Sequence, residues 1–135
     1  MKLPLLLAVF SAIMWCTPPA YAASDFSLAF DVTYNVNEDA EAFVIKHIYF
    51  TNLTTNAYPT AYYLDIPDDA TDISAFDRTG KVPFDLLVQD GIRKVRLTLN
   101  NIPLGLNSET EITVTYRTKS ITATSKSGRV ITIPI

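Results

Sequence analysis

Hydrophobic and polar residues alternate along most of the chain, most clearly between residues 26 and 36. Six apolar side chains take every second position of this segment: Phe26, Leu28, Phe30, Val32, Tyr34 and Val36. A period of two places them on one face of a β-strand, whereas a helix would distribute them around its circumference. The segment is therefore predicted to be a half-buried strand, followed by a turn at residues 37–40.

Seven further segments show strand patterns separated by turn residues: 42–50, 60–66, 72–76, 84–88, 94–99, 111–118 and 130–133. Residues 42–50 are apolar on both parities, which predicts a central strand covered on both sides for part of its length. Asp90-Gly91 is a favoured hairpin dipeptide. No window sustains helical spacing of apolar residues. The chain is therefore predicted to be all-β, an immunoglobulin-like β-sandwich of about seven antiparallel strands.

The same alternation predicts which side chains form the core: Val32, Tyr34, Val44, Ile48, Leu64, Leu97, Val114 and Tyr116. We expect Val130 to Ile133 to pair within the sandwich, and Ile135 to point towards a neighbouring domain or the end of the chain. Because the sequence ends inside an apolar strand pattern, either this strand docks firmly or the sequence is one module of a longer protein. We favour the second interpretation.

The first 22 residues have the features of an export signal. Lys2 precedes an apolar run from Leu3 to Trp15, and Ala20-Tyr21-Ala22 matches the small-x-small pattern that signal peptidase recognises. A retained membrane anchor would need about 20 apolar residues, and a lipoprotein would place a small residue where Trp15 precedes Cys16. We therefore predict a signal peptide over residues 1–22, cleaved between Ala22 and Ala23, and a secreted, periplasmic or cell-envelope protein.

Cleavage would leave one domain, residues 23–135, whose composition excludes several functions. Cys16 is the only cysteine and would leave with the signal peptide, which excludes disulfides, thiol catalysis and thiolate metal sites in the mature chain. Ten basic residues would remain against fourteen acidic ones, a net charge of −4. An acidic chain gains nothing from a phosphate backbone, so nucleic acid is not an expected partner. Contact with the membrane is expected only through the transient export signal.

No catalytic set is evident. His47 is the only histidine, it lies in the most apolar strand, and the sequence contains no Gly-x-Ser-x-Gly elbow. We therefore predict that this chain is not an enzyme, that it has no catalytic residues and that it needs no cofactor.

Two candidate ligand or modification sites are based on local patterns. Asp65, Asp68, Asp69 and Asp72 gather around one turn and are calcium candidates, although their spacing matches no EF-hand and Asp is common in turns. Asn52-Leu53-Thr54 is an N-glycosylation sequon in an expected loop.

Two further groups of residues could serve binding. Arg93, Lys94 and Arg96 form the only dense basic group. We interpret them as protection of an exposed face or edge, and an anion-binding patch is the alternative. The middle of the chain is rich in tyrosine, at Tyr49, Tyr58, Tyr62 and Tyr63. Tyrosine is favoured at interfaces because it combines an apolar ring with a polar tip, but it is also a good strand former.

Four short motifs resemble the N-terminal β-sandwich of exported bacterial transglutaminase-like proteins: D-x-x-Y at Asp31 to Tyr34, T-N-L-T at Thr51 to Thr54, I-x-x-x-D-x-x-G-K at Ile73 to Lys81, and Tyr116 to Lys119 leading into Ile131 to Pro134. The resemblance implies an accessory domain, since the Cys-His-Asp enzyme domain of those proteins lies further along the chain. A second likeness, to the β-sandwich of ribophorin-type proteins, implies the same architecture.

The sequence therefore predicts an exported, non-enzymatic accessory or interaction module of a cell-envelope protein, with another protein or a downstream domain as its partner. One alternative is the N-terminal part of a transglutaminase-like or peptidase-like protein. The other is a glycan- or calcium-binding module.

Overall fold

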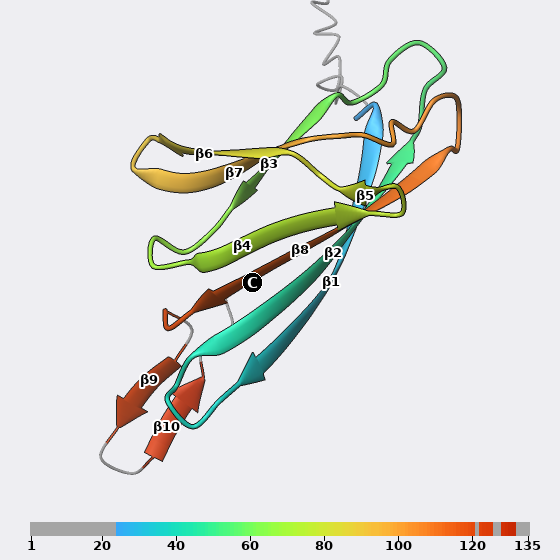
Figure 1. The fold of residues 1–135 in the computed structure, drawn as a ribbon. Helices are drawn as coiled ribbons and strands as arrows, with labels where there is room; N and C mark the ends of the chain where they lie inside the picture. The colour runs from blue at the N-terminus through green and yellow to red at the C-terminus, as the bar shows by residue number, and fades with distance from the viewer. Residues whose placement is uncertain (1–23, 121, 126–127, 132–135) are drawn as a thin grey trace, which may run out of the picture.

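The computed structural model describes residues 24–120, 122–125 and 128–131, and contains ten β-strands there and no helix (Figure 1). The strands are β1 (Phe26–Val36), β2 (Ala42–Asn52), β3 (Ala61–Asp65), β4 (Thr71–Asp77), β5 (Gly80–Lys81), β6 (Phe84–Gln89), β7 (Ile92–Thr98), β8 (Glu109–Thr118), β9 (Thr122–Ser125) and β10 (Gly128–Ile131). The all-β prediction is confirmed. The predicted signal peptide and its cleavage site at Ala22 and Ala23 lie outside the described residues.

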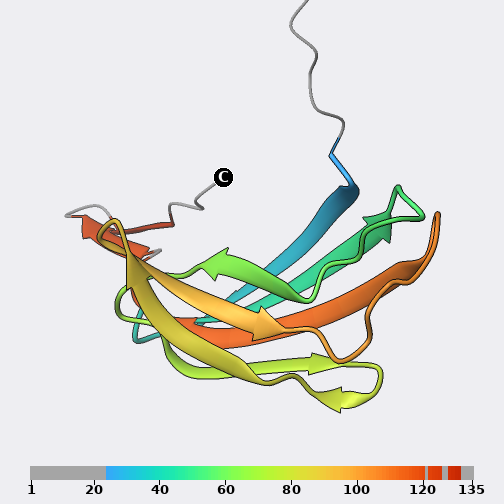
Figure 2. The same cartoon turned by 90° about the horizontal axis from the view of Figure 1, so that it is seen from above.

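Two antiparallel sheets pack face to face as a β-sandwich. The large sheet has the order β1-β2-β8-β4-β5 and the small sheet the order β3-β7-β6. Seen from above, the small sheet crosses in front of the large one (Figure 2). The strand β8 lies between β2 and β4, although it follows both strands of the β6–β7 hairpin in the chain. This placement makes β1 one edge of the large sheet and β3 one edge of the small sheet.

The turns form where the sequence has the residues for them. Asn37 Oδ1 accepts hydrogen bonds of 3.0 Å from the backbone N–H groups of Asp39 and Glu41, which closes the turn from β1 to β2. Asp90 and Gly91 have φ angles of 53° and 77°, the positive values that a two-residue hairpin with the right twist requires. The predicted hairpin at these two residues is confirmed.

The core lies between the sheets, where the large sheet contributes the even-numbered apolar residues of β2 and β8 and the small sheet contributes Leu64, Val95 and Leu97. Val44, Ile48, Leu64, Leu97, Val114 and Tyr116 are buried, as predicted. Val32 and Tyr34 are half-buried and pack against this core. The odd-numbered residues of β2 face away from the small sheet and are half-buried or exposed. The prediction that residues 42–50 are covered on both sides is therefore wrong, because no second layer packs on the outer face within the described chain.

The prediction for the last strand is also wrong. Val130 lies in β10, which pairs with β9 in a separate two-stranded sheet beyond the end of β8 (Figure 1). Residues 132–135, including Ile133 and Ile135, lie outside the described residues. Two short strands were not predicted: β5 has only two residues, and β9 has the sequence TATS, without a large apolar residue to show an alternation.

Candidate functional site

A groove opens between the edge strands β1 and β3, on the side where the small sheet stops short of β1. Its volume is about 560 Å³. We call it the tyrosine groove, and its lining residues are Phe30, Val32, Tyr34, Lys46, Tyr62, Tyr63, Leu64, Asp65 and Lys94. Because its two walls come from edge strands of different sheets, both walls carry backbone without a neighbouring strand in the described chain.

Aromatic rings supply most of the exposed apolar surface of the groove. Phe30 and Tyr63 are each 50% exposed, although Phe30 has the inward parity of β1. Tyr62 stands edge-on to the core ring of Phe50, with 5.1 Å between centroids. Burial raises the pKa of Tyr62, and the nearby negative charge of Asp65 raises it further. The groove therefore has an aromatic lining in which two rings, Phe30 and Tyr63, are half-exposed to solvent.

The charges in the groove are unequally paired. Lys94 Nζ lies 2.9 Å from Asp65 Oδ1. The ammonium group of Lys46 has no hydrogen-bond or ion-pair partner among residues 24–120. Burial lowers the pKa of Lys46, an effect that the charge of Asp65 partly opposes. Two lysines and one carboxylate leave the groove with one excess positive charge.

Only part of this site was visible in the sequence. Of the four tyrosines that we considered for an interface, Tyr62 and Tyr63 line the groove. Tyr49 lies on the outer face of the large sheet, and Tyr58 is 56% exposed between β2 and β3. Lys46 was missed, although it shares its even parity with the core residues of β2. Its parity alone would have placed Lys46 on the inward face of β2. We did not use this signal, because we interpreted residues 42–50 as covered on both sides.

The four calcium candidates do not converge on one point. Asp65 pairs with Lys94, while Asp69 accepts hydrogen bonds from Thr118, Ser120 and the backbone of Lys119. Burial raises the pKa of Asp69, but these hydrogen bonds outweigh it and hold the pKa below 3.8. The side chain of Asp68 is exposed. Residues 24–120 hold no group of three or more His, Cys, Asp or Glu side chains arranged for a metal ion.

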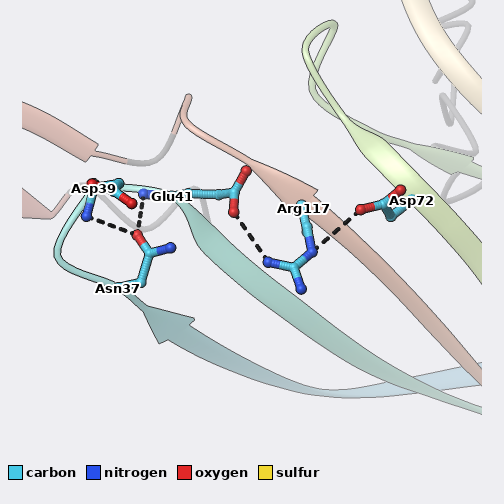
Figure 3. A network of polar contacts seen from close by, with 5 residues as sticks. All are labelled: Asn37, Asp39, Glu41, Asp72 and Arg117. Carbon is cyan, nitrogen blue, oxygen red and sulfur yellow. Dashed lines mark hydrogen bonds and ion pairs between the residues drawn. The ribbon is translucent and has the colours of Figure 1, made fainter.

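The fourth candidate, Asp72, belongs to a network that joins the β1–β2 turn to β8 and β4 (Figure 3). Arg117 of β8 lies 3.1 Å from Glu41 Oε2 and 3.3 Å from Asp72 Oδ2. Its guanidinium also lies over the Phe43 ring, 5.6 Å from the centroid. The network stabilises one end of the large sheet, where the turn after β1, β8 and the start of β4 meet.

The basic group on β7 is engaged within the domain. Arg93 Nη1 donates to the carbonyl oxygens of Asp68 and Ala70, at 2.7 and 2.9 Å. Lys94 pairs with Asp65, and Arg96 lies 3.3 Å from Asp85 Oδ2. Since β7 is the central strand of the small sheet, Lys94 and Arg96 cover its outer face and do not protect an edge.

His47 lies on the outer face of the large sheet, beside a second groove of about 690 Å³ whose lining includes Tyr49 and Glu111. Its Nδ1 is 2.8 Å from Glu111 Oε1 and 3.1 Å from Thr113 Oγ1. In a nucleophile–histidine–carboxylate relay, the hydroxyl and the carboxylate contact different ring nitrogens. Here both contact Nδ1, so the arrangement cannot pass a proton from the hydroxyl through the ring to the carboxylate. The geometry favours a structural role.

Asn52 ends β2 as a buried polar hub. Its Nδ2 donates to the carbonyl oxygens of Ala57 and Pro103, and its Oδ1 accepts from the backbone N–H of Thr54, all at 2.9 Å. The side chain is 0% exposed. A glycan on Nδ2 would replace one of its two hydrogens and so break at least one of the donated bonds, and the buried side chain leaves no space for a sugar. The structure therefore speaks against Asn52 as a glycosylation acceptor in the folded protein.

Comparison of the chain with protein-family models and with curated proteins gives no match. Among the described residues, no helix is long and apolar enough to span a membrane.

Proposed function

We propose that this chain is an exported, non-enzymatic β-sandwich module that binds another polypeptide in the tyrosine groove, as an accessory or interaction domain of a cell-envelope protein. The observation that carries the proposal is the groove itself: an opening of about 560 Å³ with half-exposed aromatic rings from two edge strands. The signal-like features of residues 1–22 support the proposed location.

Two properties of the groove favour a polypeptide as its ligand. Tyrosine and phenylalanine are enriched in the centres of protein interfaces, where they contribute large contact areas at a small entropic cost. Both walls also present edge strands, and unpaired strand edges recognise extended backbone. An accessory domain that lacks a catalytic set would act by holding or presenting such a partner.

Photo-crosslinking in cells that produce the full chain tests the proposal. A benzophenone amino acid replaces Tyr63 or Phe30 in the groove, or Leu104, which is 66% exposed and does not line the groove, as the control. We expect one defined polypeptide adduct at both groove positions and none at Leu104. Adducts of equal yield at all three positions, or at Leu104 alone, would contradict a role of the groove.

Export is tested on the same cells. N-terminal mass spectrometry of the envelope and medium fractions should find a chain that begins at Ala23. Intact Met1 on protein confined to the cytoplasm would overturn the proposed location.

A further inference from the structure

The tyrosine groove runs beside a strand edge that is unusually open to pairing. The strand β1 is eleven residues long, contains no proline, and has Asp31 as its only charged residue. Natural sheets protect long edges with lysine, proline, bulges or very short strands. Within the described chain β1 has β2 on one side and no strand on the other. An extended segment could therefore continue the large sheet beyond β1.

A strand in that position would face the groove with every second side chain. Successive side chains of a strand point to opposite faces, so alternate residues of an added strand would have the same inward direction as Phe30, Val32 and Tyr34. Those residues line the groove, together with Tyr62, which has the inward parity of β3, while Tyr63 has the outward parity and lies at the rim of the groove. The inward side chains of the added strand would then pack between the aromatic walls.

Lys46 sets the charge that the partner should bring. It lies on β2 next to β1, level with Val32 on one side and Val114 on the other. Along its own strand, the nearest inward neighbours are Val44 and Ile48, both 0% exposed. A half-buried ammonium group among apolar neighbours has lost part of its hydration without gaining an ion pair. Lys94 is less available to a carboxylate of the partner, because it already forms an ion pair with Asp65.

We infer that the partner enters the tyrosine groove as an extended β-strand that pairs with the free edge of β1 and places a carboxylate against Lys46. The inference rests on the proposed function and specifies its partner: an extended segment with apolar residues at alternate positions and an acidic residue among them. A carboxylate opposite Lys46 would form a partly desolvated, charge-assisted pair, which supplies specificity for acidic over basic segments.

A displayed library of random twelve-residue peptides, selected on the full chain, provides the probes. Each selected peptide is then measured against the Tyr63→Ala variant and against Lys46→Gln. Lys81→Gln, which removes an exposed lysine of β5 outside the groove, is the matched control. We expect the selected peptides to need Tyr63, to carry a shared Asp or Glu, and to lose about tenfold in affinity on Lys46→Gln but not on Lys81→Gln.

Two further measurements separate this pairing from other modes of binding. Replacing the shared acidic residue by its amide should cost about tenfold with the wild-type chain and almost nothing with Lys46→Gln, because both changes remove the same pair. Methylating the peptide's backbone nitrogens one at a time should weaken binding at every second position, since only alternate N–H groups of an added strand face β1. The variant Lys46→Met tests whether the loss of affinity comes from misfolding. It should keep or raise the urea midpoint of unfolding while weakening peptide binding as much as Lys46→Gln does.

The outcomes distinguish the inference from the proposed function. Peptides that bind Tyr63→Ala as well as the wild-type chain, or a selection that yields no binder, would count against the groove as a binding site and thus against both. Peptides that need Tyr63 but keep full affinity after loss of the carboxylate, or show no two-residue period on methylation, would overturn only the acidic-strand inference.

Discussion

Replacing Asn52 by alanine should destabilise the domain more than any other single change at an asparagine. The side chain makes three hydrogen bonds of 2.9 Å that join the end of β2 to the loops before β3 and before β8. Alanine leaves the carbonyl oxygen of Pro103 buried without its donor, at a cost of about 1–3 kcal/mol. The two partly buried bonds, to Ala57 and Thr54, add about 0.5–1.5 kcal/mol each. The sum is about 2–6 kcal/mol, a large share of the roughly 5–15 kcal/mol that holds a small domain.

Urea unfolding measures this loss. With a slope of roughly 1–2 kcal/mol per molar urea, the midpoint of Asn52→Ala should fall by about 1–6 M. Asn56→Ala is the matched control, because Asn56 is exposed in the same loop and its side chain accepts one bond, of 3.2 Å from Thr55. Its midpoint should change by less than the equivalent of about 0.5 kcal/mol. A midpoint of Asn52→Ala equal to that of Asn56→Ala would refute the argument that this buried hub is required.

Three further changes test the register, the ionisation and the strand order. Ile48→Ala should cost about 2–5 kcal/mol by leaving a cavity in the core, while Ile45→Ala on the outer face of the same strand should cost clearly less; equal urea midpoints would mean that the register is wrong. Burial raises the pKa of Tyr116 from 10.0 to about 12, so the folded chain keeps a proton that the unfolded chain releases, and stability that is complete below pH 10 should fall by about 2–3 kcal/mol towards pH 12. Tyr116→Phe should abolish this alkaline loss in urea titrations, and an unchanged pH profile would contradict the assignment. Val130→Pro should leave the melting temperature unchanged, because β10 pairs with β9 in a separate sheet, whereas Val114→Pro in β8 should prevent folding. A lower melting temperature for Val130→Pro would restore the sequence prediction that this strand supports the sandwich.

Local patterns predicted the strands well where alternation was long. The segment from Phe26 to Val36 has the same bounds in sequence and structure, and the Asp90-Gly91 turn forms as expected. Alternation is a property of one strand and its two faces, so it needs no knowledge of neighbours. The position of β8 between β2 and β4 is a property of three distant segments, and no pattern within residues 109–118 specifies it.

The polar residues were harder to interpret because their role depends on what surrounds them. Asn52 fits a sequon, yet one of the two carbonyl groups that its side chain binds, that of Pro103, lies 51 residues away in the chain. The four aspartates cluster in the sequence, but three of them bind separate partners in the structure. Asp65 pairs with Lys94, Asp72 pairs with Arg117, and Asp69 accepts a hydrogen bond from Thr118. The role of each of these polar residues depends on its partner on another strand. It cannot be predicted from the sequence until the order of the strands is known.

The open groove follows from the unequal sizes of the two sheets. Three strands cannot cover five, so Leu28 and Phe30 remain 42% and 50% exposed although they have the inward parity of β1. Covering each of these half-exposed side chains would contribute only about 1 kcal/mol. Association costs at least about 4 kcal/mol in lost freedom of motion, so this apolar surface alone cannot hold a partner. In the inferred mode of binding, backbone pairing along β1, contact with the tyrosine rings and a charge near Lys46 would supply the remaining free energy. A partner that lacks any of these three should dissociate more quickly, which would make the groove selective.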